Sequence, residues 1–315
     1  MHLVSALCVS LFAVGWAIAD DVLPERVVTA PRVGGSVAAG TSLLVLDAAD
    51  LDRSGTLALD DALRQVAGFS LFRRNGSLAA HPTTQGVSLR GFGGSGASRT
   101  LVLLDGVPLN DPFGGWVPWA LVPLLGLDRV EIGRSPDPLW GAVGGAIQLV
   151  RTTPTGPAAT VISEGGSHGT ARGELALGTV GGPVAATLTL AHRRTDGYPV
   201  VRADQRGPID EPAGSNDTAF DTRVSYQAGT NTTAALHVAG LDETRHNGTP
   251  YTDNAQRLLL SDVTVRHRAA PGVGWQLALW ARQQRFESHF SAVGQRRRAE
   301  RPSVDQFAVP SAAGG

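Results

Sequence analysis

The second half of the chain consists of short segments in which polar and apolar residues alternate. After Pro157 such segments lie at residues 187–190, 223–228, 236–238 and 275–279. Alternation with a period of two places the apolar side chains on one face of a β-strand and the polar side chains on the other. A wall with lipid on one side and water on the other requires this pattern, and a soluble β-sandwich shows it as well.

The connections between these segments favour the wall over the sandwich. Brief connections around 181–183, 229–232 and 270–274 alternate with long polar ones at 195–219, 242–254 and 288–305. Short turns at one end of the strands and long loops at the other are typical of bacterial outer-membrane β-barrels. We count about seven strands, and residues 306–309 are a candidate for an eighth.

The composition agrees with insertion into a membrane by strands. The 315 residues carry a net charge of -1 with 17% charged residues, which excludes a nucleic-acid binder that works through bulk basic charge. After the first 19 residues the sequence has no apolar run long enough for a transmembrane helix. The mean hydropathy of -0.01 fits strands that alternate polar and apolar residues.

Residues 1–19 are almost wholly apolar and end in Ala17-Ile18-Ala19, just before two aspartates. Small residues at these spacings predict a signal peptide that is cleaved on export. A single-pass membrane anchor is the alternative, although the run is short for a span of about 20 residues. Cys8 is the only cysteine and would leave with the signal peptide, so we expect no thiol chemistry in the mature chain.

Residues 41–155 show the pattern of a small mixed α/β domain. Strands are predicted at 42–46, 69–72, 87–89, 101–104 and 129–132, and a helical turn at 48–51. Leu59, Ala62, Leu63 and Val66 are spaced to line one face of a helix that Gly68 ends.

Two motifs in this domain resemble the plug-domain signatures of TonB-dependent outer-membrane receptors. The first reads QGVSLRGF from Gln85 and TLVLLDGVPLNDP from Thr100, with a turn at Asp105-Gly106. The second follows a strand and ends in a double glycine before an apolar strand. Ser135 stands where that family usually has glycine, and Asp137-Pro138 makes the turn stiffer. The residues that match the two signatures are Gly91, Asp105, Gly106, Asn110, Arg134, Trp140, Gly141, Gly144 and Gly145.

The resemblance implies an α+β plug domain, with a small mixed sheet and short helices, followed by antiparallel transmembrane β-barrel strands over 156–315. Barrels of this family have 22 strands, and the residues after Pro157 would supply only about seven residues to each. A tilted membrane strand needs roughly 9–11 residues. We therefore expect the barrel to be incomplete and the chain to be the N-terminal part of a receptor, truncated or from a partial gene.

The same resemblance implies TonB-dependent import of a scarce nutrient across the outer membrane, with TonB, outer-membrane lipid and a small-molecule substrate as partners. Residues 20–40 would be a flexible segment that contains a TonB box, which pairs with the sheet edge of its partner through main-chain hydrogen bonds. The predicted box is Glu25, Arg26, Val27, Val28, Thr29 and Ala30.

Arg90 and Arg134 match family arginines that pair with glutamates on the inner barrel wall. Breaking such a pair leaves a buried charge at a cost of about 3–5 kcal/mol, so the pair can act as a latch. The other interpretation is that both arginines are solvated in a polar lumen. The double glycine is expected to let backbones approach closely where the plug meets the barrel.

Ligand contacts are expected at the apices of the plug and in the long loops. The candidate residues are Ser95, Arg99, Trp116 and Trp119, although the two tryptophans would equally suit the plug core. The substrates that the resemblance allows are ferric siderophores, cobalamin, haem, other metal chelates and some glycans. The arginines at 296–298 form either a solvated loop face or a contact with lipopolysaccharide phosphates.

The sequence contains no pattern of catalytic or metal-ligating residues, so we predict neither an enzyme nor a resident cofactor or metal. An alternative of another class is a secreted or periplasmic plug-like binding module that does not transport.

Overall fold

The structure, a computed structural model, describes residues 43–73, 75–89, 98–134, 142–270 and 273–315. The described strands form one five-stranded sheet, one eight-stranded sheet and one two-stranded sheet. Within these ranges no helix is both long and apolar enough to cross a membrane. The predicted signal peptide, the predicted TonB box, Arg90, Gly91, Ser95, Trp140 and Gly141 lie outside the described residues.

Residues 43–151, called the plug below, form the mixed α/β unit that the sequence predicts. Its sheet has the order β1-β6-β7-β4-β5, in which β4 and β7 are parallel and the other neighbours antiparallel. Strands β2 and β3 pair separately. In chain order the elements are β1 (Leu43–Asp47), α1 (Ala48–Arg53), α2 (Leu59–Leu63), β2 (Phe69–Leu71), η1 (Pro82–Thr84), β3 (Val87–Leu89), β4 (Leu101–Leu104), β5 (Val107–Pro108), η2 (Trp119–Leu121), η3 (Leu124–Gly126), β6 (Leu127–Gly133) and β7 (Ala146–Arg151).

Local sequence explains where the first helix begins. Asp47 caps α1, because its Oδ1 accepts a hydrogen bond from the Asp50 backbone at 2.8 Å and Asp50 Oδ2 accepts one from the Asp47 backbone at 3.0 Å. Leu59, Ala62, Leu63 and Val66 are all buried as predicted, but the second helix is shorter than predicted: α2 ends at Leu63, so Val66 and Gly68 lie beyond it. These side chains join β3, β4, β6 and β7 in one core.

The double glycine permits close approach within the plug. A side chain at Gly144 would place its Cβ 2.8 Å from the carbonyl oxygen of Arg99, and Gly145 has φ +92° and faces the carbonyl oxygen of Gly133. The expectation that these glycines serve the contact between plug and barrel is therefore wrong, because their backbone neighbours are plug residues beside β4 and at the end of β6.

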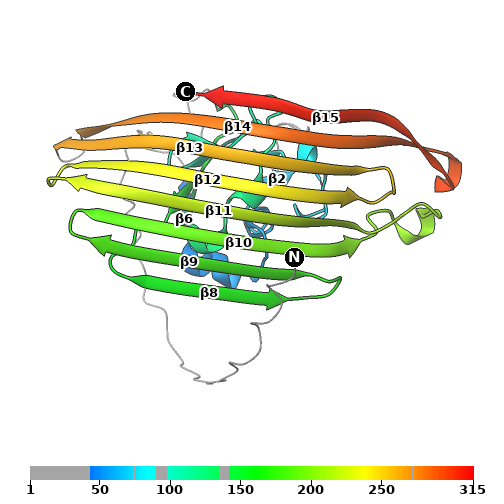
Figure 1. Cartoon of the computed structure of the whole chain (residues 1–315), viewed down its shortest axis with the longest axis horizontal. Coiled ribbons are helices and arrows are strands. Elements are labelled where there is room, and N and C mark those ends of the chain that lie inside the picture. Colours follow the sequence, from blue (N-terminus) through cyan, green and yellow to red (C-terminus); the bar gives the residue numbers. More distant parts are fainter. Residues whose placement is uncertain (1–42, 74, 90–97, 135–141, 271–272) are drawn as a thin grey trace, which may run out of the picture. The chain divides into compact units, whose positions relative to one another are not determined.

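The eight-stranded sheet, called the wall below, holds its strands in chain order from β8 to β15, each antiparallel to the next (Figure 1). The sequence count of about seven strands with a candidate eighth is close, because residues 306–309 lie within β15. The strands are β8 (Ala158–Gly165), β9 (Ala171–Gly181), β10 (Val184–Tyr198), β11 (Ala213–Ala228), β12 (Thr232–Asn247), β13 (Asp253–Ala270), β14 (Val273–Val293) and β15 (Glu300–Gly314).

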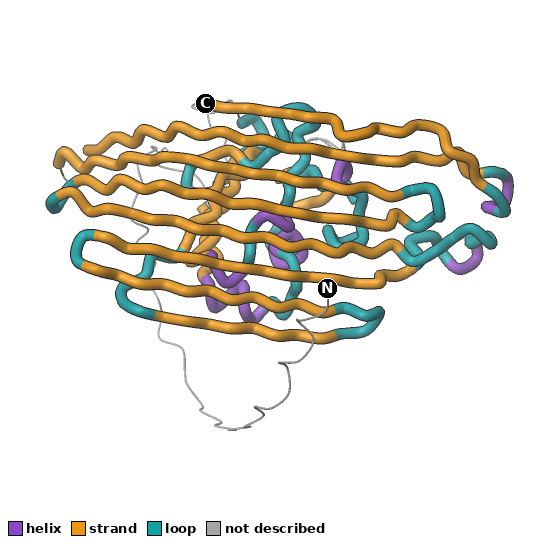
Figure 2. Tube along the Cα trace, viewed as in Figure 1, coloured by secondary structure: helices purple, strands orange, loops and turns teal. Residues whose placement is uncertain are grey.

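The short turns at 182–183 and 229–231 occur where the sequence predicts them, and residues 271–272 of the third lie outside the described residues. The predicted long connections are shorter than expected, at 199–212, 248–252 and 294–299 (Figure 2). Polar residues assigned to the loop at 242–254 in fact continue the strands, and Glu243, Arg245 and Asn254 are buried. These polar residues belong to the polar inner face of the wall. In the sequence alone, polar residues at these positions look the same as a polar loop.

We expect Gly145→Ala to destabilise the folded chain by at least about 2 kcal/mol, because the new methyl group combines a left-handed backbone with a clash against Gly133. Urea unfolding of the full chain in detergent micelles, followed by tryptophan fluorescence, measures this. Gly156→Ala is the matched control, since a Cβ at Gly156 meets no atom within 4 Å. Equal midpoints for the two variants would contradict the assignment.

Candidate functional site

The inner face of the wall is where the two structural units meet, and it holds the plug through arginines. Arginines from four wall strands donate to main-chain carbonyl oxygens of the plug, and Arg245 also reaches that of Ser77. The contacts are Arg193 to Ala120 at 2.7 Å, Arg245 to Ala80 at 3.1 Å, Arg266 to Asp105 at 3.0 Å and Arg282 to Leu109 at 2.8 Å. Their acceptors are backbone atoms, so these contacts depend on the path of the plug chain more than on its side chains.

Most of these arginines find their counter-charge or polar partner on the wall itself. Arg193 is 2.8 Å from Asp217, and Arg245 is 2.5 Å from Glu243. Arg266 and Arg282 each have a neutral amide as wall neighbour, Gln276 and Gln284. Arg282 differs in that its carboxylate partner, at 3.3 Å, is Asp111 of the plug. Arg282 is therefore a wall charge that the plug neutralises.

A chain of buried charged groups crosses from the plug to the wall at Arg151. This residue ends β7, and its Nε donates to Asp105 Oδ2 at 2.9 Å within the plug. Its Nη1 lies 3.3 Å from Asp221 Oδ2 on β11. His237 of β12 continues the chain, with Nε2 2.9 Å from Asp221 and Nδ1 2.6 Å from Asp262 of β13. An imidazole flanked by two carboxylates suits the form that donates through both nitrogens.

Burial alone would lower the pKa of Arg151. The carboxylates of Asp221, Asp105 and Asp262 outweigh that effect, so the pKa of Arg151 is raised above its ordinary value. The arginine stays charged in the interface, and its contacts act as ion pairs at every pH at which the carboxylates are ionised.

The first plug signature supplies the geometry of this network. Asp105 and Gly106 both have positive φ, at 49° and 95°, and make the turn from β4 to β5. That turn aims the Asp105 carboxylate back at β7, where Oδ1 also accepts from the Arg151 backbone at 3.2 Å. Asn110 fixes the return strand, because its Oδ1 accepts from the Val102 backbone at 2.7 Å and its amide donates to the Thr100 carbonyl at 3.2 Å.

The wall contacts also orient the plug. Along β14, which runs from a short turn to a long-loop end, Gln276 contacts Asp105, Arg282 contacts Asp111 and Ser288 contacts His81. The plug segment around His81 therefore lies toward the long loops, Asp111 lies at the middle of the strand, and the Asp105 turn lies toward the short turns. A ligand that arrives from the long-loop side meets the His81 segment first.

A buried carboxylate holds the His81 segment in place. Asp60 of α2 accepts from Arg73 at 2.6 Å and from the Ser77 hydroxyl at 2.5 Å. Burial lowers the pKa of Arg73 to about 10, and the charge of Asp60 opposes that shift. His81 itself packs against Phe290 of the wall with ring centroids 5.3 Å apart. Burial, and then the charge of Arg245, lower its pKa to about 4.

Of the candidate ligand residues in the described chain, Arg99 is exposed, whereas Trp116 and Trp119 are buried. Trp119 is part of the plug core, and the Trp116 ring lies 5.9 Å from that of Phe286. The sequence allowed two roles for these tryptophans, ligand contact and core packing. In the structure both are packed in the interior. Phe113, which lies between Asp111 and Trp116, is 89% exposed.

Arg134 is half-buried and donates to the carbonyl oxygen of Ala67 in the plug at 2.7 Å. The pairing of Arg90 and Arg134 with wall glutamates stays a prediction. The sequence did not single out Arg151 or Asp221. The available signals were a lone arginine at the end of an apolar strand and an aspartate that the alternation places on the inner face.

An α+β unit seated against the polar inner face of an antiparallel wall is the architecture of the plugged-barrel class of outer-membrane proteins. Residues 37–146 match the family model described as TonB-dependent Receptor Plug Domain. Residues 37–146 therefore belong to the plug-domain family of TonB-dependent receptors, and the strands that follow are arranged as in solved structures of such receptors.

Solved structures show the same fold at low sequence identity. The siderophore receptor PiuA from Acinetobacter baumannii aligns with a TM-score of 0.60 and 13% identity over 80% of this chain and 37% of its own. FpvA from Pseudomonas aeruginosa, bound to a pyoverdine–iron complex, gives 0.60 and 15% over 82% and 36%. A mutant of the ferric enterobactin receptor PfeA from Pseudomonas aeruginosa, in complex with enterobactin, gives 0.53 and 14% over 83% and 45%. The chain spans less than half the length of each.

We expect Arg151→Gln to cost about 3–5 kcal/mol of folding stability, because it leaves Asp105 and Asp221 buried without their counter-charge. Adding Asp221→Asn should recover part of that loss, and a double-mutant cycle on the full chain in micelles measures the coupling. Arg129→Gln on β6 is the control, since Arg129 is less buried and pairs only locally, with Asp128 and Glu131. Additive effects of the two interface substitutions would contradict the network.

The folded chain should lose stability on acidification because of His81. Its folded pKa of about 4 lies below the unfolded value of 6.5, so the unfolded state binds more protons between these values. The contribution of neutral His81 to the free energy of unfolding is fully present above pH 6.5. It falls as the pH drops toward 4, by at most about 3 kcal/mol. Unfolding midpoints at pH 7.5 and 4.5 should differ less in His81→Gln than in the parent. The exposed His246→Gln should leave the difference unchanged.

Proposed function

We propose that the chain is the N-terminal portion, plug and first wall strands, of a receptor for TonB-dependent import of a ferric siderophore or similar metal chelate across the outer membrane. The observation that carries the proposal is the plug domain seated on the polar inner wall through Arg151 and Asp221. A binding module without transport has no need of a buried, charged interface between plug and wall.

The nature of that interface supports a plug that moves. Hydrogen bonds and ion pairs can be exchanged for contacts with water, so a polar interface separates with less net loss than an apolar one of equal area. Four wall arginines hold the plug by its backbone carbonyls, and each of them keeps a wall partner when the plug leaves. Arg151, Arg223 and Arg282 each have a carboxylate partner across the interface, and these ion pairs are lost when the plug leaves.

Siderophore chelates are favoured as substrates because the aligned structures include receptors solved with enterobactin and with a pyoverdine–iron complex. On this chain, Arg99 and Phe113 are exposed residues of the plug. The Ser98 backbone donates to the Gly115 carbonyl at 2.9 Å, which brings their two segments together. A cation and an exposed aromatic ring on two joined segments suit an anionic, partly aromatic chelate.

We expect Val28→Pro to abolish energised uptake and to leave ligand binding intact. Proline has no N–H group to donate, so it disrupts strand pairing by the predicted TonB box. Uptake of radioactive iron as its chelate, by iron-starved cells of the source bacterium that carry the variant in the chromosomal gene, measures this against a deletion strain. Val33→Pro is the matched control outside the box and should transport normally.

Equal uptake by both proline variants and the parent would contradict the proposal. Recovery of the chain in the periplasm with full chelate binding and no uptake would favour the binding module instead.

A further inference from the structure

The outer face of the wall changes from apolar to polar along one continuous level. Odd-numbered residues of β13 and even-numbered residues of β10, β11 and β12 face outward, and strand pairing joins them into rows. One apolar row is Ala186, Val224, Leu236, Val263 and Leu279. Nearer the long loops, a polar row contains His192, Thr218, Asp242, Arg257 and Arg285. Aromatic Tyr226 and Trp275 stand near the short-turn end of the apolar band.

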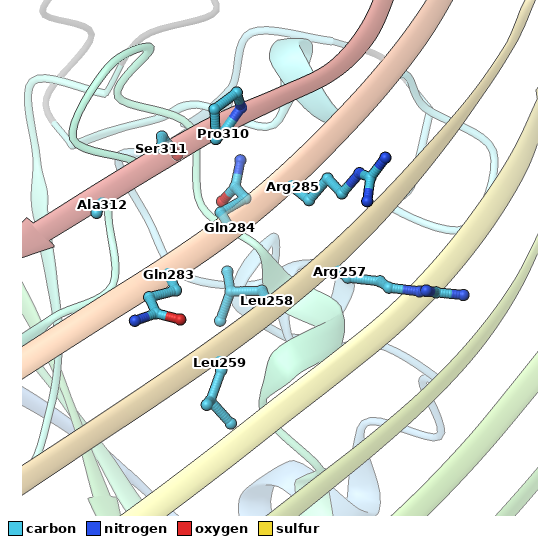
Figure 3. Close-up of a pocket in the computed structure, with 9 residues that line it drawn as sticks. All are labelled: Arg257, Leu258, Leu259, Gln283, Gln284, Arg285, Pro310, Ser311 and Ala312. Carbon is cyan, nitrogen blue, oxygen red and sulfur yellow. The ribbon is translucent and has the colours of Figure 1, made fainter.

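A pocket of about 600 Å³ lies at this boundary, across β13, β14 and β15 (Figure 3). Arg257 and Arg285 line its polar side, directly opposite each other in the register of β13 and β14. Leu259, Gln283 and Ala312 form the next row toward the apolar band. In Figure 3 the two arginine side chains extend toward the same side of the sheet.

The two arginines are incompletely neutralised. Arg257 Nε donates to Asp242 at 3.0 Å and Arg285 Nε lies 3.6 Å from Glu287, and neither carboxylate lines the pocket. Among the described residues, the terminal guanidinium nitrogens of both have no hydrogen-bond partner. Like charges directly opposite on neighbouring strands repel each other unless an anion lies between them. Their side chains are 77% and 62% exposed, so an anion can reach them.

We propose that this pocket binds the phosphate of an anionic membrane lipid, with its acyl chains along Leu259 and the apolar rows below. Guanidinium groups bind phosphate through paired hydrogen bonds. A free phosphate ion would make no favourable contact with Leu259 and the apolar rows. Long loops mark the outer side of such walls, so the lipid is the phosphorylated glycolipid of the outer leaflet, lipopolysaccharide. The proposal rests on the proposed function only in placing the wall in the outer membrane.

The arginines of the long loop at 296–298 are less suited to this role. Arg297 forms an ion pair with Asp210, in which Nε lies 2.7 Å from Oδ1, and this pair connects one long loop to another. Arg257 and Arg285 instead stand on strands at the level where the apolar band ends, which is the level of lipid headgroups.

The test is native mass spectrometry of the full chain in micelles, titrated with lipid A, the phosphorylated anchor of lipopolysaccharide. Replacing both arginines (Arg257→Gln with Arg285→Gln) should weaken lipid A retention roughly thirtyfold, since each basic residue near an anionic lipid surface contributes about fivefold. The control, Arg202→Gln with Arg268→Gln, removes the same charge from exposed positions away from the pocket and should retain lipid A fully. The double lysine variant keeps the charges, shows whether the site tolerates substitution and should retain most of the binding.

Equal retention by the double glutamine variant and the parent would overturn the proposal, as would an equal loss in the control. Equal binding of dephosphorylated lipid A would show an apolar contact only, and displacement by inorganic phosphate at equal concentration would show a free-anion site; either result refutes the lipid site. Iron uptake provides the separate readout for the proposed function: failure of the parent chain's receptor to import iron would refute import and leave the lipid result standing.

Discussion

The arrangement of plug and wall depends on the buried bridge from Asp105 through Arg151 to Asp221. Burying a guanidinium group is unfavourable unless carboxylates surround it, and here one comes from the plug and another from the wall. Neither the plug nor the wall alone provides both carboxylates that surround Arg151. The charges therefore favour a single position of the plug on the wall. The apolar contacts of Ala219, Ala239 and Leu241 with the plug core add area to the interface but little direction.

The rest of the interface is organised around the plug backbone. Because Arg193, Arg245 and Arg266 donate to carbonyl oxygens, plug side chains can change at those places without loss of the contact. The constraint falls on the chain path, and the signature residues set that path: the Asp105-Gly106 turn and the amide of Asn110 hold β4 and β5 in register. This accounts for a fold shared with solved receptors at 13–15% identity.

Sequence reasoning located most elements of the plug because their signals are local. The four-residue spacing of Leu59 and Leu63 predicts α2 without knowledge of its neighbours, although Gly68 placed the end of the helix too late. The wall strands were found by alternation, but their ends were misplaced where Glu243 and Arg245 face the plug, since inward polarity resembles a loop. Arg151 was missed because its wall partner is 70 residues away in the chain. Such pairings depend on how plug and wall dock, which no local pattern records.

The position of β1 determines how the plug responds to tension. This strand lies at the edge of the plug sheet and pairs only with β6 among the described strands, through the antiparallel register from Leu43 opposite Gly133 to Asp47 opposite Arg129. Force on the chain ahead of Leu43 loads the pairing from one end. Hydrogen bonds then break one after another, as in opening a zipper, and the peak force is lower than if all shared the load. The capped helix α1 and the Arg151 bridge come later along the chain, so the plug can yield at its N-terminal edge while its seating on the wall persists.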